Sequence, residues 1–150
     1  MATINATINL TSPDIASSPL SLSKTMMMTK AGSCNGLELS SGLVTRKFTA
    51  TTLVDLVTIG EQMYGTPTAS VANKLYIKNT GSSTTDFVTI GLGDATGGEE
   101  LNDGTSQITL GKLFGGDWMV IPFEGSTNND IMVTPSTAEA TTIEWMLFFE

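Results

Sequence analysis

From Lys74 to the end of the chain, short apolar segments alternate with turns that contain glycine. Val, Ile, Thr and aromatic residues, which favour strands, fill the segments, and Gly, Asn and Ser fill the turns. The clearest expected strands are LYIKN (75–79), FVTIG (87–91), WMVIPF (118–123), DIMVT (130–134) and TTIEWMLFF (141–149). Strands that recur roughly every 8–14 residues are typical of sandwiches, jelly rolls and barrels. The sequence therefore predicts an all-β fold, an antiparallel β-sandwich or jelly roll of about eight to ten strands.

Three segments give sharper expectations about the core. WMVIPF is apolar nearly throughout, which predicts a central strand, with Pro122 at a strand end or bulge because proline has no N–H for the ladder. Trp118 and Trp145 lie in apolar strands and are expected in the core. Residues 46–60 (RKFTATTLVDLVTIG) are rich in Thr and Val, which favours one continuous strand; a helical turn around residues 52–57 also fits their spacing.

The N-terminal region is the most separable part of the chain. Residues 3–10 (TINATINL) place Ile4, Ile8 and Leu10 among Thr and Asn, which fits an edge strand or an arm that reaches a neighbouring molecule. Residues 11–19 hold two prolines and several serines, which predicts a loop. We therefore expect an N-terminal arm and linker over residues 1–19 and a β-sandwich domain over residues 20–150. The run Met26 to Met28 is expected either to fill a core or to form an adaptable binding surface.

Composition narrows the classes of function. The chain has 15 acidic and 7 basic residues, a net charge of −8, which disfavours binding to nucleic acid or to anionic membranes. No segment approaches the roughly 18 apolar residues of a spanning helix, and the N-terminus lacks the pattern of a secretory signal. Histidine is absent and Cys34 is the single cysteine, so neither a Cys/His metal set nor a histidine-activated thiol is available. We expect no enzymatic activity and no cofactor.

Two loops remain as candidate ligand sites. Residues 94–107 carry Asp94, Glu99, Glu100 and Asp103, oxygen ligands of the kind that Ca²⁺ prefers, although their spacing matches no known calcium loop and a solvated acidic loop is the simpler interpretation. Residues 61–73 form a long connection with an aromatic side chain, Tyr64. Paired carboxylates also serve glycoside hydrolysis, but sequence cannot place two acids across a cleft, so a glycosidase is only a third alternative.

The C-terminal half carries a recognisable order of motifs. LYIKNTGSS is followed by FVTIG, then by LGKLFGGDWMVIPFEG, then by DIMVTPS and a final aromatic strand. A strand that ends in KNTG, followed by the pattern L-x-x-G-(D/E)-x-x-x-x-P from Leu113 to Pro122, resembles small virion proteins of tailed bacteriophages. Over residues 73–150 the chain is most similar to their β-sandwich head decoration, or cement, proteins; the N-terminal half resembles no family that we can name.

This resemblance implies a structural role. Decoration proteins bind the outer surface of the capsid, bridge neighbouring subunits of the major capsid protein and act as dimers or trimers, often with a terminal arm on the shell. On this chain the expected contacts are Ile4, Ile8 and Leu10 of the arm, which could add a strand to the partner, and the basic pair Arg46 and Lys47. The alternative is a tail- or fibre-associated jelly-roll module that binds a cell-surface glycan through Tyr64, Asp94 and Asp103.

Overall fold

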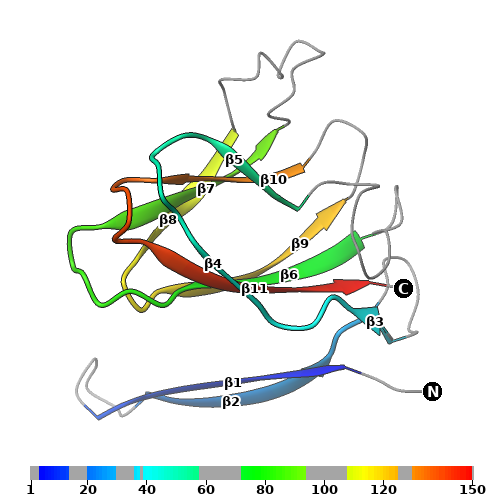
Figure 1. The fold of residues 1–150 in the computed structure, drawn as a ribbon. Helices are drawn as coiled ribbons and strands as arrows, with labels where there is room; N and C mark the ends of the chain where they lie inside the picture. The colour runs from blue at the N-terminus through cyan, green and yellow to red at the C-terminus, as the bar shows by residue number, and fades with distance from the viewer. Residues whose placement is uncertain are drawn as a thin grey trace.

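The computed structural model describes residues 4–13, 20–29, 36–37, 39–57, 72–93, 108–124 and 130–149. Within these residues the chain forms eleven strands, all of whose pairings are antiparallel, and no helix (Figure 1). The strands are β1 (Asn5–Ser12), β2 (Leu20–Met27), β3 (Leu39–Ser40), β4 (Val44–Lys47), β5 (Val54–Val57), β6 (Ala72–Asn79), β7 (Phe87–Gly93), β8 (Ile108–Phe114), β9 (Trp118–Glu124), β10 (Asp130–Pro135) and β11 (Thr142–Phe149). The predicted all-β antiparallel sandwich is confirmed, while the jelly-roll connectivity stays a prediction.

Two sheets form the sandwich. The first sheet has the strand order β5-β10-β7-β8 (Figure 1). In the second sheet, β3 and β4 pair with one edge of β11, β6 pairs with the opposite edge of β11, and β9 pairs with β6. Alternate residues of each strand point between the sheets, as the strictly alternating burial along β11 shows. Among the described residues, most buried apolar side chains belong to one cluster, which forms the core. It contains Phe48, Leu56, Val57, Leu75, Ile77, Val88, Ile90, Leu113, Ile131, Val133, Ile143, Trp145, Leu147 and Phe149.

The expectation of one continuous strand over residues 46–60 is wrong. β4 pairs with β11 in one sheet and β5 pairs with β10 in the other, so the chain crosses between the sheets after Lys47. At the crossing, the buried Phe48 enters the core, its N–H donates to Thr141 O at 3.1 Å, and its carbonyl accepts from Glu139 N at 2.8 Å. The Thr and Val content of the segment suits both strands but does not reveal the bend between them. Residues 58–60 lie outside the described residues.

The KNTG motif (residues 78–81) is hydrogen-bonded to the GGD turn (residues 115–117) at one end of the sandwich. Asn79 is buried, and its side-chain amide donates to Leu113 O at 3.1 Å while its Oδ1 accepts from Gly81 N at 3.0 Å. Its main chain pairs with the turn in both directions, donating to Asp117 O and accepting from Gly116 N, each at 2.9 Å. The pattern that resembles phage virion proteins is therefore a structural joint between β6 and the β8–β9 turn.

Candidate functional site

Strands β1 and β2 form a two-stranded ribbon (Asn5–Ser12 with Leu20–Met27) that belongs to neither sheet of the sandwich (Figure 1). Its outward face is polar: the hydroxyls of Thr7 and Thr25 lie 2.9 Å apart, and Ser23 donates to Asn9 Oδ1 at 2.6 Å. The other face is mainly apolar, with Lys24 as its charged member. Its apolar residues are Ala6, Ile8, Leu10, Leu22 and Met26. The alternation of polar and apolar residues along each strand produces this amphipathic ribbon.

The expected division after residue 19 stays a prediction; the strands on either side of it, β1 and β2, pair with each other. Ile8 and Leu10 lie on β1, one strand of the ribbon, and Ile4 directly precedes this strand. The ribbon is fixed to the rest of the molecule beside Met28. The N–H of Met28 donates to Ile4 O and its carbonyl accepts from Leu37 N, both at 2.8 Å, and the side chains of Met28 and Leu37 are buried.

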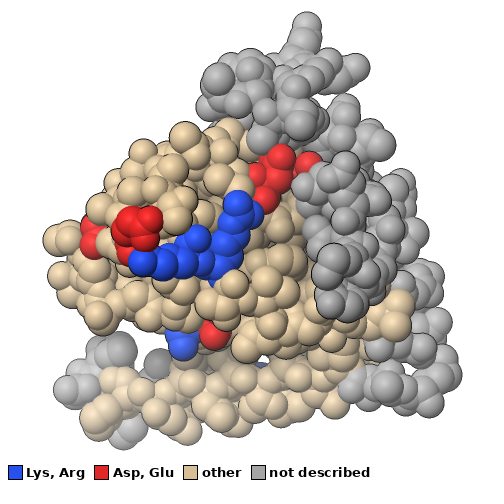
Figure 2. Space-filling model, viewed as in Figure 1, with Lys and Arg blue, Asp and Glu red and all other residues tan. Residues whose placement is uncertain are grey.

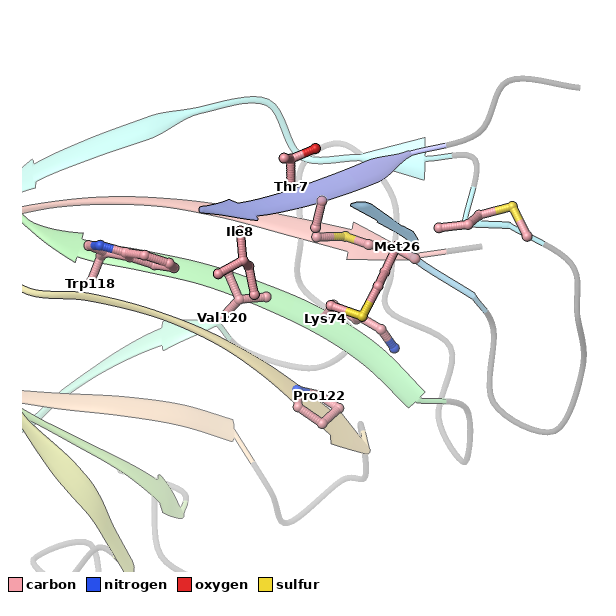
Figure 3. A pocket seen from close by; sticks show the side chains of 10 residues that line it. Thr7, Ile8, Met26, Lys74, Trp118, Val120 and Pro122 are labelled. Atoms are coloured by element: carbon pink, nitrogen blue, oxygen red, sulfur yellow. The ribbon is translucent and has the colours of Figure 1, made fainter. Parts of the chain in front are cut away.

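A cavity of about 450 Å³, the slot, lies between the ribbon and the outer face of β6 and β9 (Figure 3). Ile8 points across it toward Val120, and Met26 lies above Lys74, whose ammonium donates to Thr29 O at 3.2 Å. The side chains that point into the slot are apolar except for the Lys74 ammonium, whereas the Thr7 side chain points away from it (Figure 3). The lining residues are Ala6, Thr7, Ile8, Met26, Met27, Met28, Lys74, Trp118, Val120 and Pro122.

Strand β9 is an edge strand of the described sheet and not the central strand that its composition predicts. Met119 and Ile121 face the core, whereas Trp118, Val120 and Pro122 line the slot on the opposite face. Both faces of β9 are apolar because the face opposite the core lies under the ribbon. Pro122 has no N–H to donate, and the edge position of β9 accommodates it within the strand.

The two tryptophans occupy different environments. Trp145 is 6% exposed in the core, as expected, but Trp118 is 54% exposed in the slot, so its expected core position is wrong. Sequence reasoning missed the slot residues of β6 and β9, which are Lys74, Trp118, Val120 and Pro122. The available signal was the unbroken apolar run of β9, which fits an edge strand with a covered outer face as well as it fits a central strand.

The basic pair Arg46 and Lys47 does not join the slot. It lies on β4, which is separated from β9 by β11 and β6. Arg46 is over the Phe48 ring at 5.4 Å and donates to Asp55 O at 3.4 Å, while Lys47 forms an exposed ion pair with Glu139 at 2.8 Å. Figure 2 shows a short stripe of Lys and Arg side chains on this face of the molecule, with acidic residues at its ends. The two parts of the expected capsid contact are therefore on different regions of the molecule.

One polar pair on the outer face of the same sheet is already satisfied internally. Tyr76, two residues from Lys74 on β6, donates its hydroxyl proton to Glu144 Oε1 at 2.7 Å. Burial, then the hydrogen bond and the negative charge of Glu144, raise the pKa of Tyr76 to about 12. The phenol therefore stays protonated at neutral pH and keeps its partner on β11.

The residues of the alternative glycan site lie outside the described residues. Tyr64, Asp94 and Asp103 belong to this group, as does Cys34, so the glycan site and the calcium loop stay predictions. Among the residues that the structure does describe, no cluster of three or more His, Cys, Asp or Glu side chains is arranged to hold a metal ion. The described residues also contain no helix that is long and apolar enough to cross a membrane.

Comparison of the chain with protein-family models, with curated proteins and with solved structures finds no match. The ribbon and the slot are therefore assigned as the candidate binding surface from the geometry of this structure alone.

Proposed function

We propose that this protein is a structural virion protein that binds the outer surface of a phage capsid and stabilises the shell by bridging its major capsid subunits. The observation that carries this proposal is the amphipathic ribbon, which stands outside the sandwich and keeps apolar side chains exposed at Leu10, Leu22 and Met26. Exposed apolar groups of this kind mark surfaces that bind other macromolecules. The resemblance of residues 73–150 to phage head decoration proteins suggests that the partner is a major capsid protein.

The ribbon is well suited to adhesion. Neither of its strands pairs with any other strand among the described residues, so their outer edges can accept a strand of a partner through main-chain hydrogen bonds. Its described residues, including Ile4 and Met28 at its base, hold a single charge, that of Lys24, whereas the whole chain has a net charge of −8. The ribbon can therefore approach another acidic protein with less repulsion than the remainder of the chain.

Deletion of residues 1–27 tests the proposal, because it removes both ribbon strands and no member of the core cluster. We expect the truncated protein to keep a cooperative unfolding transition and to bind shells stripped of the native protein at least about tenfold more weakly. The full chain with Leu43→Ser, a change of an exposed apolar residue outside the ribbon, is the matched control and should bind normally. Undiminished binding by a folded truncated protein would exclude the ribbon as the adhesive element.

A further inference from the structure

The slot has the size and the lining of a site for one small molecule. Its volume of about 450 Å³ lies within the range of roughly 300–1,000 Å³ that is typical of ligand pockets in proteins. Such pockets are mainly apolar and hold a few polar groups that orient the ligand. In the slot, the side chains that point inward are apolar except for the Lys74 ammonium (Figure 3). A ligand that fits this slot therefore has an apolar body and one polar group.

The charge of the slot favours an anionic group on the ligand. The slot lining contains no Asp or Glu, and the Cα partners of Lys74 on the adjacent strands are Pro122 and Phe148. An ammonium has three N–H donors, and the bond from Lys74 to a main-chain carbonyl uses one of them. Lys78 lies on the same face of β6, but its Cα partner on β11 is the acidic Glu144. Lys74 is therefore the better placed of the two to pair with a ligand carboxylate.

The shape of the slot favours a thin, unbranched apolar body. Along β9 the slot wall runs from Trp118 to Pro122, a length of roughly 13 Å at about 3.3 Å per residue. Midway along this wall, Ile8 points across the slot toward Val120 and narrows it (Figure 3). An extended aliphatic chain passes between these two side chains more readily than a fused ring system does. The methionines of the lining are flexible and can adapt to such a chain.

We propose that the slot binds one medium-chain aliphatic carboxylate, a fatty-acid-like molecule whose carboxylate pairs with Lys74 and whose chain lies between the ribbon and β9, toward Trp118. The bound chain covers the apolar faces that the ribbon and the sandwich turn toward each other. A two-stranded ribbon is marginally stable in water by itself, so the ligand fixes the ribbon against the sandwich. Leu10 and Leu22 do not line the slot and stay exposed for contact with a shell.

Calorimetric titration of the purified full chain with decanoate, below the concentration at which it forms micelles, tests this proposal. The experiment contains no particles, so its result does not depend on the proposed function. We expect one decanoate bound per chain. Decanoate should bind roughly 15-fold more tightly than octanoate, because each buried methylene contributes about fourfold in affinity. Decanol, which has the chain without the charge, should bind at least about tenfold more weakly than decanoate.

Lys74→Met separates the charge of the slot from its apolar contacts. Methionine keeps an apolar stem but removes the ammonium, so decanoate should bind about tenfold more weakly while decanol binds with unchanged affinity. Lys78→Met is the matched control, because Lys78 lies on the same face of β6 but does not line the slot; this variant should bind decanoate as the wild type does. The comparison of decanoate with decanol on the wild-type chain decides the same question if a variant does not fold.

The emission of Trp118 shows where the chain binds. Trp118 is 54% exposed, so decanoate should shift its emission to shorter wavelength, and Trp118→Phe should abolish the shift because Trp145 is buried in the core. Absence of saturable binding, equal affinity for decanoate and decanol, equal losses in the two lysine variants, or binding that leaves the emission unchanged would each overturn the proposal. An emission shift that shells cause and decanoate does not would overturn it too and would identify a partner protein as the occupant of the slot.

Discussion

Gly115→Ala is expected to lower the free energy of unfolding by about 3 kcal/mol. A Cβ on Gly115 would lie 2.5 Å from Ser83 O, 2.8 Å from Gly81 O and 2.8 Å from Ser83 N. All three atoms belong to the main chain, so no side-chain rotation relieves the contact and the β8–β9 turn must move away. That movement also strains the 3.1 Å hydrogen bond from Gly115 N to Ser83 O. Urea denaturation of the purified variant measures the loss.

Gly111→Ala is the matched control for this substitution. Gly111 lies on β8, a few residues before the turn; a Cβ added there would have no atom within 4 Å, and its φ is not positive. We expect Gly111→Ala to leave stability unchanged or to raise it by about 0.5 kcal/mol, since alanine restricts the unfolded chain. Equal losses for the two variants would show that close packing at Gly115 is not the cause.

Asn79→Ala is expected to cost roughly 2–3 kcal/mol, because it leaves the buried Leu113 carbonyl and the Gly81 N–H without their partner. Asn79 is 2% exposed, so water does not readily replace its amide. Asn79→Asp separates the two bonds, since a carboxylate can accept from Gly81 N but cannot donate to Leu113 O. The same denaturation experiment ranks the variants, and Asn79→Asp should be less stable than wild type.

Thr80→Ala is the neighbouring control. The Thr80 hydroxyl donates to Thr142 O at 3.1 Å in an exposed position, where water can take its place. Its removal should cost no more than about 0.5 kcal/mol. A wild-type stability for Asn79→Ala would contradict the role that we assign to the joint between KNTG and the GGD turn.

The sheet-forming segments could be predicted from sequence because their local patterns agree with their final environment. In β11, for example, alternate residues from Ile143 to Phe149 are buried, as strict alternation predicts. Residues 46–60 could not be divided correctly, because the bend after Lys47 depends on Phe48 entering a core built from distant strands. The sequence pattern shows the periodicity of this segment, but it does not show with which sheet each half of the segment pairs.

The candidate site was harder to predict for a similar reason. Ile8 and Leu10 were predicted as contact residues without their strand partner, β2, which was assigned to the sandwich. Trp118 was assigned to the core, and the segment that contains Val120 to a central strand, because an apolar outer face has the same composition as a buried one. Only the position of the ribbon over β9 distinguishes the two cases (Figure 3). Arg46 and Lys47 lie elsewhere because their sheet position depends on long-range pairing with β11.

The number of copies of this protein in purified particles from its source tests whether it binds the shell as proposed. Quantitative mass spectrometry would compare it with the major shell protein of the same particles. The proposed shell-stabilising role requires a ratio near one, or near a simple fraction such as one-third, because a lattice-bridging protein occupies every equivalent site on the capsid. A handful of copies per particle would instead place the protein at a vertex or tail, and its absence from particles would contradict a virion role altogether.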